Sequence, residues 1–411
     1  MTTASPFAYP AWRAFLFARF SATLAMTMLV VVIGWEVYDI ARQTRSVRDA
    51  AWLLGLVGLA QFLPVFGLTL AVGAIADRFD RRWIARGAVL VELAGAAALA
   101  GLALGDGRTL WPLFAVAALL GVARAFAGPA LAALAPNLVP PPALPTAIAW
   151  SSMGFQAGAV LGPLVGGLLY DRAPPLAYAT AGLLFLGALI ALLAIPPVPR
   201  QEAGRVSVRE GLAYVRSNRV VLGAISLDLA AVVLAGATAM LPIYARDILH
   251  VGPDGLGLMR AAPAVGAAVM ALWLTRFPLR TRVGERLFGA VAVFALGTIA
   301  FGLSTTLPVA VASLVVLGAA DMVSVYVRAS LIQLHTPDAM RGRVSAVSLL
   351  FIAASNELGE FRAGTLAAVI GAVPATVLGG VAALAVTGLW AWWFPELRRV
   401  DRLEVPELVK A

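Results

Sequence analysis

Cysteine is absent from this chain of 411 residues, histidine occurs only at His250 and His335, and the single lysine is Lys410. Without cysteine there can be no disulfide, thiol nucleophile or thiolate metal site. Two isolated histidines are too few for a histidine-rich metal site, so no metal or other cofactor is expected. No G-x-x-x-x-G-K-[ST] segment is present, which argues against ATP-driven pumping.

Charge is also scarce. Only 13% of the residues are charged and 61% are apolar, and the mean hydropathy is +0.89. About a quarter of the residues in a soluble protein are charged, so this chain has too few charges to cover a large soluble fold. The net charge of +9 comes from arginines between long apolar runs. This pattern indicates loop charges at a membrane surface, and no nucleic-acid partner is expected.

Twelve apolar runs are long enough to cross a bilayer, which takes roughly 20 residues. They are continuous, whereas a β-barrel has alternating segments of about ten residues. The sequence therefore predicts an all-α membrane protein with twelve transmembrane helices. The runs are 14–40, 52–76, 84–105, 110–135, 145–170, 175–197, 220–245, 256–276, 286–305, 308–333, 344–370 and 373–395.

The arginines between the runs predict the orientation. Most of them lie in segments that are cytoplasmic if the N-terminus is, and cytoplasmic loops are enriched in positive charge. We therefore expect a multi-pass protein of the cell membrane, the inner membrane of a bacterium, with both termini in the cytoplasm. The first outer loop is the exception, with Arg42, Arg45 and Arg48. The first run is too long for a signal-peptide core, so we expect it to be retained.

The longest internal polar segment, 199–219, divides the chain into two halves. We expect a six-helix bundle at 1–198, a cytoplasmic linker at 199–219 with a short surface helix near 208–216, a second bundle at 220–397 and a cytoplasmic tail at 398–411. A faint repeat supports the two halves. It pairs Leu120-Gly121-Val122-Ala123 in run four with Leu317-Gly318-Ala319-Ala320 in run ten.

The loop between runs two and three carries a specific pattern, G-x-x-x-D-R-x-x-R-R. It resembles the signature of the major facilitator superfamily, and the resemblance implies two pseudo-symmetric six-helix bundles. It also implies a conformational latch in which the aspartate meets a helix N-terminus. The latch residues would be Gly73, Asp77, Arg78, Arg81 and Arg82. The equivalent loop, 274–286, lacks the Gly and Asp, so the latch is expected in the first half alone.

Two further segments resemble motifs of the same superfamily. Run four contains Arg124 followed by Gly128, similar to the helix-four motif whose arginine is linked to proton coupling. The glycines and proline of run five resemble the antiporter motif found mainly in exporters: Gly158, Gly162, Pro163, Gly166 and Gly167. Tracts around 228–263 and 337–345 are similar to the branch that includes enterobactin exporters and drug-efflux proteins.

Ionisable residues inside membrane spans are functional candidates by default. We expect the central cavity or its rim to hold four carboxylates with two arginine partners, which together carry the coupled proton: Asp228, Asp321, Glu357, Glu360, Arg124 and Arg328. Glu92 is a further candidate. Glu36 and Asp39, near the outer end of run one, are expected to meet water. The remaining suggestions for a substrate-binding lining are Arg19, Trp35, Gln61, Gln156, Tyr244 and Asn356.

These observations predict a secondary transporter that is not an enzyme. The resemblance implies alternating access, in which protons drive the export of a small organic solute such as a drug or siderophore by a monomer in the lipid bilayer. A proton-coupled importer of a metabolite on the same fold is the main alternative. A membrane enzyme lacks the necessary metal or nucleophile cluster, and a receptor or scaffold has no appended signalling domain to support it.

Overall fold

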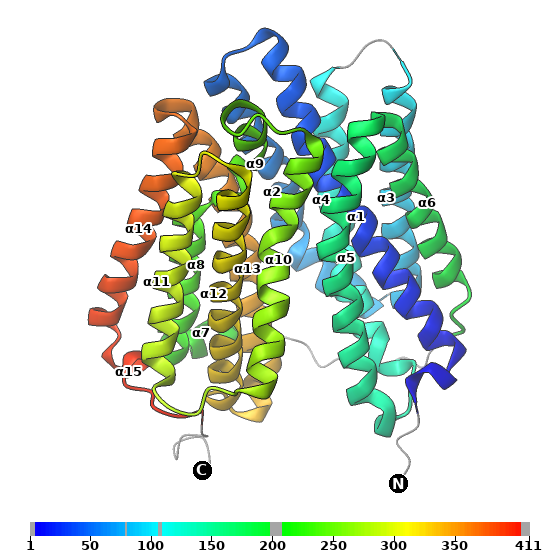
Figure 1. Cartoon of the computed structure of the whole chain (residues 1–411). Coiled ribbons are helices and arrows are strands. Elements are labelled where there is room, and N and C mark those ends of the chain that lie inside the picture. The colour runs from blue at the N-terminus through cyan, green and yellow to red at the C-terminus, as the bar shows by residue number, and fades with distance from the viewer. Residues whose placement is uncertain (1–4, 79, 106–108, 198–207, 404–411) are drawn as a thin grey trace. The chain divides into compact units, whose positions relative to one another are not determined.

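The computed structural model describes residues 5–78, 80–105, 109–197 and 208–403, without the side chains of 69–79, 133 and 338–339. Every regular element in these ranges is a helix (Figure 1). The helices are α1 (Pro10–Thr44), α2 (Val47–Arg78), α3 (Arg81–Ala103), α4 (Leu110–Leu134), α5 (Leu144–Arg172), α6 (Pro174–Leu193), α7 (Val208–Ser217), α8 (Arg219–Ala235), α9 (Leu241–Ile243), α10 (Pro253–Arg276), α11 (Val283–Gly302), α12 (Leu307–Leu334), α13 (Asp338–Ile370), α14 (Ala372–Trp393) and α15 (Pro395–Arg398).

Among the described residues, 12 helical segments are long and apolar enough to cross a membrane. They overlap the twelve runs found in the sequence, so the prediction of an all-α protein with twelve spans is confirmed. Local signals explain where some of them begin. Pro10 starts α1, where its fixed φ suits the first turn. Asp80 precedes α3, and its carboxylate accepts a hydrogen bond from Arg82 N at 2.9 Å.

The seventh span departs from the prediction of one continuous helix over 220–245. Helix α8 ends at Ala235, Gly236 adopts φ 52°, and a 3₁₀ turn, α9 and a π-helical turn follow as far as Ile248. A left-handed residue ends a helix, and glycine adopts that conformation with little strain. Pro242 lacks the N–H that an uninterrupted helix would use. The span is therefore discontinuous.

The short helix expected near 208–216 is present as α7. Val215 on one of its faces packs into an apolar cluster with Val221, Ile332, Val344 and Val347. The Tyr214 hydroxyl donates to His335 O, which also accepts from the Asn218 side chain at 3.3 Å. These contacts hold α7 against the ends of α12 and α13.

The chain forms two compact units. Unit 1 comprises residues 1–46, 56–203 and 250–261, and unit 2 comprises 47–55, 204–249 and 262–411. Each unit thus contains a short segment from the other half of the sequence. Helices α2 and α10 contribute residues to both units.

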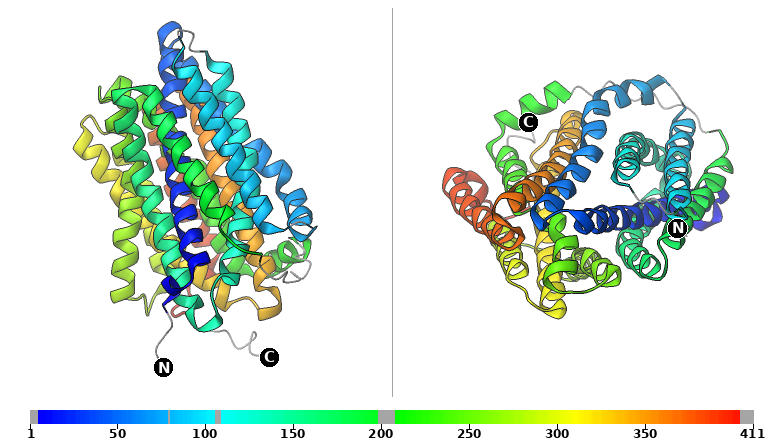
Figure 2. Two further views of the ribbon diagram at one scale, coloured as in Figure 1. Left: turned by 90° about the vertical axis from the view of Figure 1, so that its right-hand side faces the viewer. Right: turned by 90° about the horizontal axis from the view of Figure 1, so that it is seen from above.

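Within unit 1, α1 packs against α5 and α6, and α3 packs against α4 and α6. The pair α1 and α5 lies side by side in Figures 1 and 2. Glycines every four residues along α5 face α1, at Gly154, Gly158, Gly162 and Gly166. Small residues at this spacing let two helix backbones approach closely, which is the usual way to gain packing energy in lipid.

Within unit 2, α11 packs against α12 and α14, and α8 packs against α13 and α14. The residues after α15 return to the start of α11: Val400 O accepts from Gly284 N at 2.9 Å, and the Asp401 carboxylate accepts from Arg282 N at 3.0 Å. The N-terminus of α11 is therefore capped by a residue from far along the chain.

The repeated Leu-Gly-x-Ala segments occupy equivalent crossings. In unit 1, a Cβ on Gly121 of α4 would collide with the backbone of Gln61 in α2. In unit 2, a Cβ on Gly318 of α12 would collide with the backbone of Pro263 in α10. A glycine is required at both positions because two backbones touch there. The repeat therefore marks the same contact in each half.

Candidate functional site

The central candidate is an ion pair inside unit 2. The Arg328 guanidinium on α12 contacts the Asp228 carboxylate on α8, and the two residues are 5% and 8% exposed. A buried charge is tolerated only with a partner of opposite sign. The structure thus brings together two of the residues selected from the sequence, in the roles of carboxylate and arginine partner.

A second cluster lies where the seventh span is interrupted. The Thr238 hydroxyl donates to Glu360 Oε1 at 3.4 Å, and the Arg362 guanidinium donates to Leu234 O near the end of α8. A cation at a helix C-terminus is favourable because the last carbonyls have no partner within the helix. The capping role of Arg362 depends on the break at Gly236, which was not predicted from the sequence.

The other carboxylates of unit 2 are placed differently. Glu357 is buried on α13, whereas Asp321 on α12 is half-buried. Glu357 and Glu360 stand three residues apart on one helix, as the sequence requires.

In unit 1, the buried carboxylate of Glu92 on α3 is within reach of the charge of Arg124 on α4. Arg124 itself is exposed. The sequence named Arg124 as a partner for carboxylates of the second half, and Glu92 as a further candidate. Unit 1 therefore has its own carboxylate and arginine on neighbouring helices.

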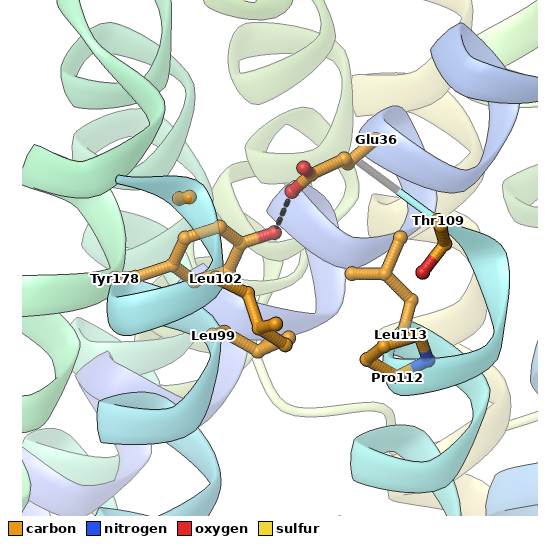
Figure 3. A pocket seen from close by; sticks show the side chains of 8 residues that line it. Glu36, Leu99, Leu102, Thr109, Pro112, Leu113 and Tyr178 are labelled. Atoms are coloured by element: carbon orange, nitrogen blue, oxygen red, sulfur yellow. Dashed lines mark hydrogen bonds between the residues drawn. The ribbon is translucent and has the colours of Figure 1, made fainter. Parts of the chain in front are cut away.

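Glu36 does not meet water as expected from its position near the end of the first run. It is 5% exposed and accepts a hydrogen bond from the Tyr178 hydroxyl of α6 (Figure 3). The prediction was wrong because α1 continues to Thr44, which places Glu36 more than two turns before the helix ends. Pairing with a residue on α6 cannot be read from the sequence of α1.

The helix-five glycines serve two contacts within unit 1. Thr27 on α1 donates a hydrogen bond from Oγ1 to Gly158 O at 3.0 Å, and Gly162 and Gly166 lie against α1 one and two turns further along. On the other side, Gly167 and Pro163 lie against the first turns of α10. The motif thus holds three helices in close contact.

Only part of the expected latch is described. Gly73, Asp77 and Arg78 lie outside the residues whose side chains are described, and Arg81 is half-buried. Arg82 forms a two-pronged ion pair with Asp80, with its shortest contact at 2.6 Å, and also donates to Ile195 O. Asp80, which the sequence did not single out, could have been found as a helix N-cap.

The hydrogen bond from Arg82 is the largest of the effects that lower the pKa of Asp80, and the arginine charge adds to it. Arg86 donates to Leu192 O at 2.9 Å and to Ile195 O at 3.2 Å. Two arginines at the start of α3 therefore bind the carbonyl end of α6, where a helix attracts cations. The cluster ties the second loop of the chain to the end of the sixth span.

The suggested substrate-binding residues differ in how deeply they are buried. Trp35, Gln61 and Tyr244 are buried, and the Tyr244 hydroxyl donates to Gly302 O at 2.6 Å. Arg19 and Gln156 are half-buried and Asn356 is exposed. Arg19 lies over the ring of Phe155, with 5.6 Å between the guanidinium carbon and the ring centroid.

The chemistry available to these residues is proton binding and charge pairing. Among the described residues, no group of three or more His, Cys, Asp or Glu side chains is placed to hold a metal ion. Asp228 and Arg328 instead form an ion pair within spans, and ionisable residues at such positions mark proton or solute pathways in membrane proteins.

Comparison with known proteins places the chain among transporters. Residues 15–360 match the sequence profile of the Major Facilitator Superfamily. The enterobactin exporter EntS of Shigella boydii serotype 4 (strain Sb227) is 27% identical over 400 residues, which cover 95% of this chain and 93% of the relative. EntS of Citrobacter koseri is 27% identical over 399 residues with the same coverage.

Solved structures share the fold. A bacterial homolog of the human lysosomal transporter Spinster superposes with a TM-score of 0.70 at 17% identity, covering 95% of this chain and 98% of that one. The D-xylose-proton symporter superposes with a TM-score of 0.71 at 17% identity, covering 92% and 97%. At this identity the likeness shows the fold alone.

Proposed function

This chain belongs to the major facilitator superfamily and is a multi-pass membrane transporter rather than an enzyme, and on that premise we propose that it is a proton-coupled exporter of a small organic solute. It works as a monomer in the inner membrane of a bacterium, with both termini in the cytoplasm. The solute is an enterobactin-like siderophore or a drug. Two halves alternate around a site near the middle of the membrane, as in other transporters with internal repeats.

The buried pair of Asp228 and Arg328 carries the proposal of proton coupling. Protonation of Asp228 removes its charge and frees Arg328 to find another partner. A conformational change follows when the two arrangements differ in their affinity for the proton, because a ligand shifts an equilibrium only by its differential binding. The helix-five motif and the exporter relatives favour outward transport over uptake.

Everted membrane vesicles test the direction. When respiration acidifies their lumen, an antiporter moves enterobactin or a fluorescent drug into the vesicles, and collapsing the pH gradient releases it. A proton symporter on the same fold instead drives solute out of the acidified lumen. Transport that persists after the gradient is collapsed would exclude both forms of proton coupling.

The site is tested with Asp228→Asn and Glu357→Gln, two substitutions that remove a titratable group. We expect each to abolish proton-driven transport while folded protein remains in the membrane. Glu285→Gln, at the exposed start of α11, is the matched control and should transport normally. Unchanged transport in both Asp228→Asn and Glu357→Gln would remove these carboxylates from the mechanism.

The absence of native cysteine allows a clean test of the proposed orientation. A single cysteine introduced at Arg45 should react with a membrane-impermeant maleimide in intact cells, whereas one at Arg209 should react only after the membrane is opened. Labelling of Arg209→Cys in intact cells would place the linker outside and reverse the topology.

A further inference from the structure

A small cavity lies beside Glu36 near one end of unit 1 (Figure 3). Its volume is about 20 Å³, enough for one water molecule, which requires ~10–15 Å³. Leu99, Leu102 and Ala103 of α3 form one wall, and Thr109, Pro112 and Leu113 at the start of α4 form the other. Glu36 of α1 and Tyr178 of α6 complete the lining.

We propose that Glu36 and Tyr178 form a second proton-binding site, in unit 1, which exchanges its proton with water through this cavity. The use of that proton in transport rests on the proposed function, but the binding itself does not. The site is separate from the ion pair of unit 2, and its carboxyl group has a neutral hydroxyl as a hydrogen-bond donor.

The pair is held in a fixed geometry. Tyr178 is 1% exposed, and its hydroxyl donates to the Glu36 carboxyl group. The ring of Tyr170 on α5 packs edge-on against the ring of Tyr178, with centroids 6.4 Å apart. A tyrosine hydroxyl is both a donor and an acceptor, so it can hydrogen-bond the carboxyl group in its charged and in its protonated form.

The cavity connects this buried pair with the surface. Leu99 is buried, whereas Leu102 is 44% exposed and Thr109 is exposed. Both exposed residues lie next to the connection between α3 and α4. The lining thus runs from the buried pair to exposed residues, and such continuity with the surface is the condition for proton exchange by a buried acid.

The composition of the lining favours a proton over a metal cation. Only Glu36, Thr109 and Tyr178 offer side-chain oxygens, and the other five lining residues are apolar. Calcium takes 6–8 oxygen ligands and magnesium an octahedral set, roughly twice the number available here. A proton needs only the carboxyl group and a hydrogen-bond partner.

Among the described residues that line the cavity, Glu36 is the one side chain with a carboxyl group. On α6, Tyr178 faces Glu36, and on α5, Tyr170 lies behind the ring of Tyr178. The cavity residues of α3 and α4 are uncharged. On α1 itself, Asp39 lies about one turn further along. The titration of Glu36 can therefore be separated from that of Asp39 by single substitutions.

Infrared difference spectra between acidic and alkaline buffer test the proposal on the purified full chain in lipid nanodiscs. We expect the wild type to show the C=O band of a protonated carboxyl group. Glu36→Gln should lose that band, and Asp39→Asn should keep it. Tyr178→Phe should shift it, because the carboxyl group loses a hydrogen bond. Unchanged spectra of Glu36→Gln or Tyr178→Phe would overturn the site.

The cavity is tested with Ala103→Phe, which fills it without touching an ionisable group. We expect the Glu36 band to exchange into deuterium oxide more slowly in this variant than in the wild type, and an unchanged rate would overturn exchange through the cavity. All of these spectra are recorded without solute. Failure of the site thus leaves the proposed export intact, and loss of transport in Asp228→Asn leaves the band of Glu36 in place.

Discussion

Unit 1 and unit 2 both bury carboxyl groups among apolar helices, but the side chains that contact these carboxyl groups differ. In unit 2, Asp228 contacts the guanidinium of a similarly buried Arg328. In unit 1, Glu36 accepts a hydrogen bond from the Tyr178 hydroxyl, and Glu92 lies within reach of the charge of the exposed Arg124. A buried ion pair depends on both partners at once, whereas a carboxyl group bound to a hydroxyl can gain or lose a proton by itself. The comparison suggests two kinds of protonation event in one chain.

The first prediction contrasts the removal of one partner in each unit. Arg328→Met should destabilise the protein by about 3–5 kcal/mol, because it leaves the Asp228 charge buried without its partner. Tyr178→Phe removes only a hydrogen bond and should cost about 1–3 kcal/mol. Thermal unfolding in detergent measures the difference. The readout is the fraction of heated protein that remains monodisperse on gel filtration.

The double variant Asp228→Asn/Arg328→Met is the control for this contrast. It removes both charges, so we expect it to be more stable than Arg328→Met alone. If Arg328→Met unfolds at the same temperature as Tyr178→Phe, the buried carboxyl groups of the two units do not differ in their dependence on a partner.

The second prediction uses the crossings at which the units are alike. Gly121→Ala and Gly318→Ala should each destabilise the protein by about 1–3 kcal/mol, because each new Cβ meets the backbone of a neighbouring helix. Gly128→Ala is the matched control, since a Cβ there meets nothing within 4 Å. Midpoints of thermal unfolding measure all three. A neutral result at one of the two crossings would show that the two halves do not depend on the repeated glycine in the same way.

The same repeat shows what the sequence can predict. Apolar runs predict the twelve spans because each span must satisfy its own backbone hydrogen bonds in lipid. The polar linker, with its mixture of Arg and Glu, predicts α7. The Leu-Gly-x-Ala repeat indicates two related halves, but the partners of its glycines, at Gln61 and Pro263, become known only from the fold.

Long-range pairing limits what the sequence predicts about the site. Asp228 and Arg328 were selected because ionisable residues are rare in spans, yet 100 residues separate the two in the chain and nothing local pairs them. The prediction that Glu36 meets water was wrong, and its hydrogen-bond partner Tyr178 lies 142 residues away in the chain. Gly236 and Pro242 are recognisable helix breakers, but many spans of this chain tolerate glycine and proline without a break.

The third prediction concerns the acidic caps of two cytoplasmic loops in the proposed topology. Asp80 caps α3 in unit 1 from the adjacent residue, whereas Asp401 caps α11 in unit 2 from the far end of the chain. Asp80→Ala and Asp401→Ala should each cost about 0.5–2 kcal/mol. We expect the larger loss for Asp80→Ala, because Arg82 then also loses its ion pair. Unfolding temperatures at low and high salt check this, since salt screens the exposed part of that pair.

The last and smallest effect is a difference in acid sensitivity between the two units. Burial lowers the pKa of His335 below its ordinary 6.5, so the unfolded chain binds the proton more readily, and stability should fall as the pH drops below about 6.5. The hydrogen bond and charge of Arg82 lower the pKa of Asp80 below 3.8. The ionised Asp80 therefore stabilises the folded state above about pH 3.8, and this stabilisation is lost only as the pH falls through the lowered pKa. His335→Gln should therefore remove part of the loss in mild acid, and Asp80→Asn should change only the loss in strong acid. Unfolding temperatures measured across this pH range in the wild type and both variants separate the two contributions. Identical mild-acid curves for His335→Gln and the wild type would contradict the assignment to His335, whose carbonyl group holds α7 against the end of α12.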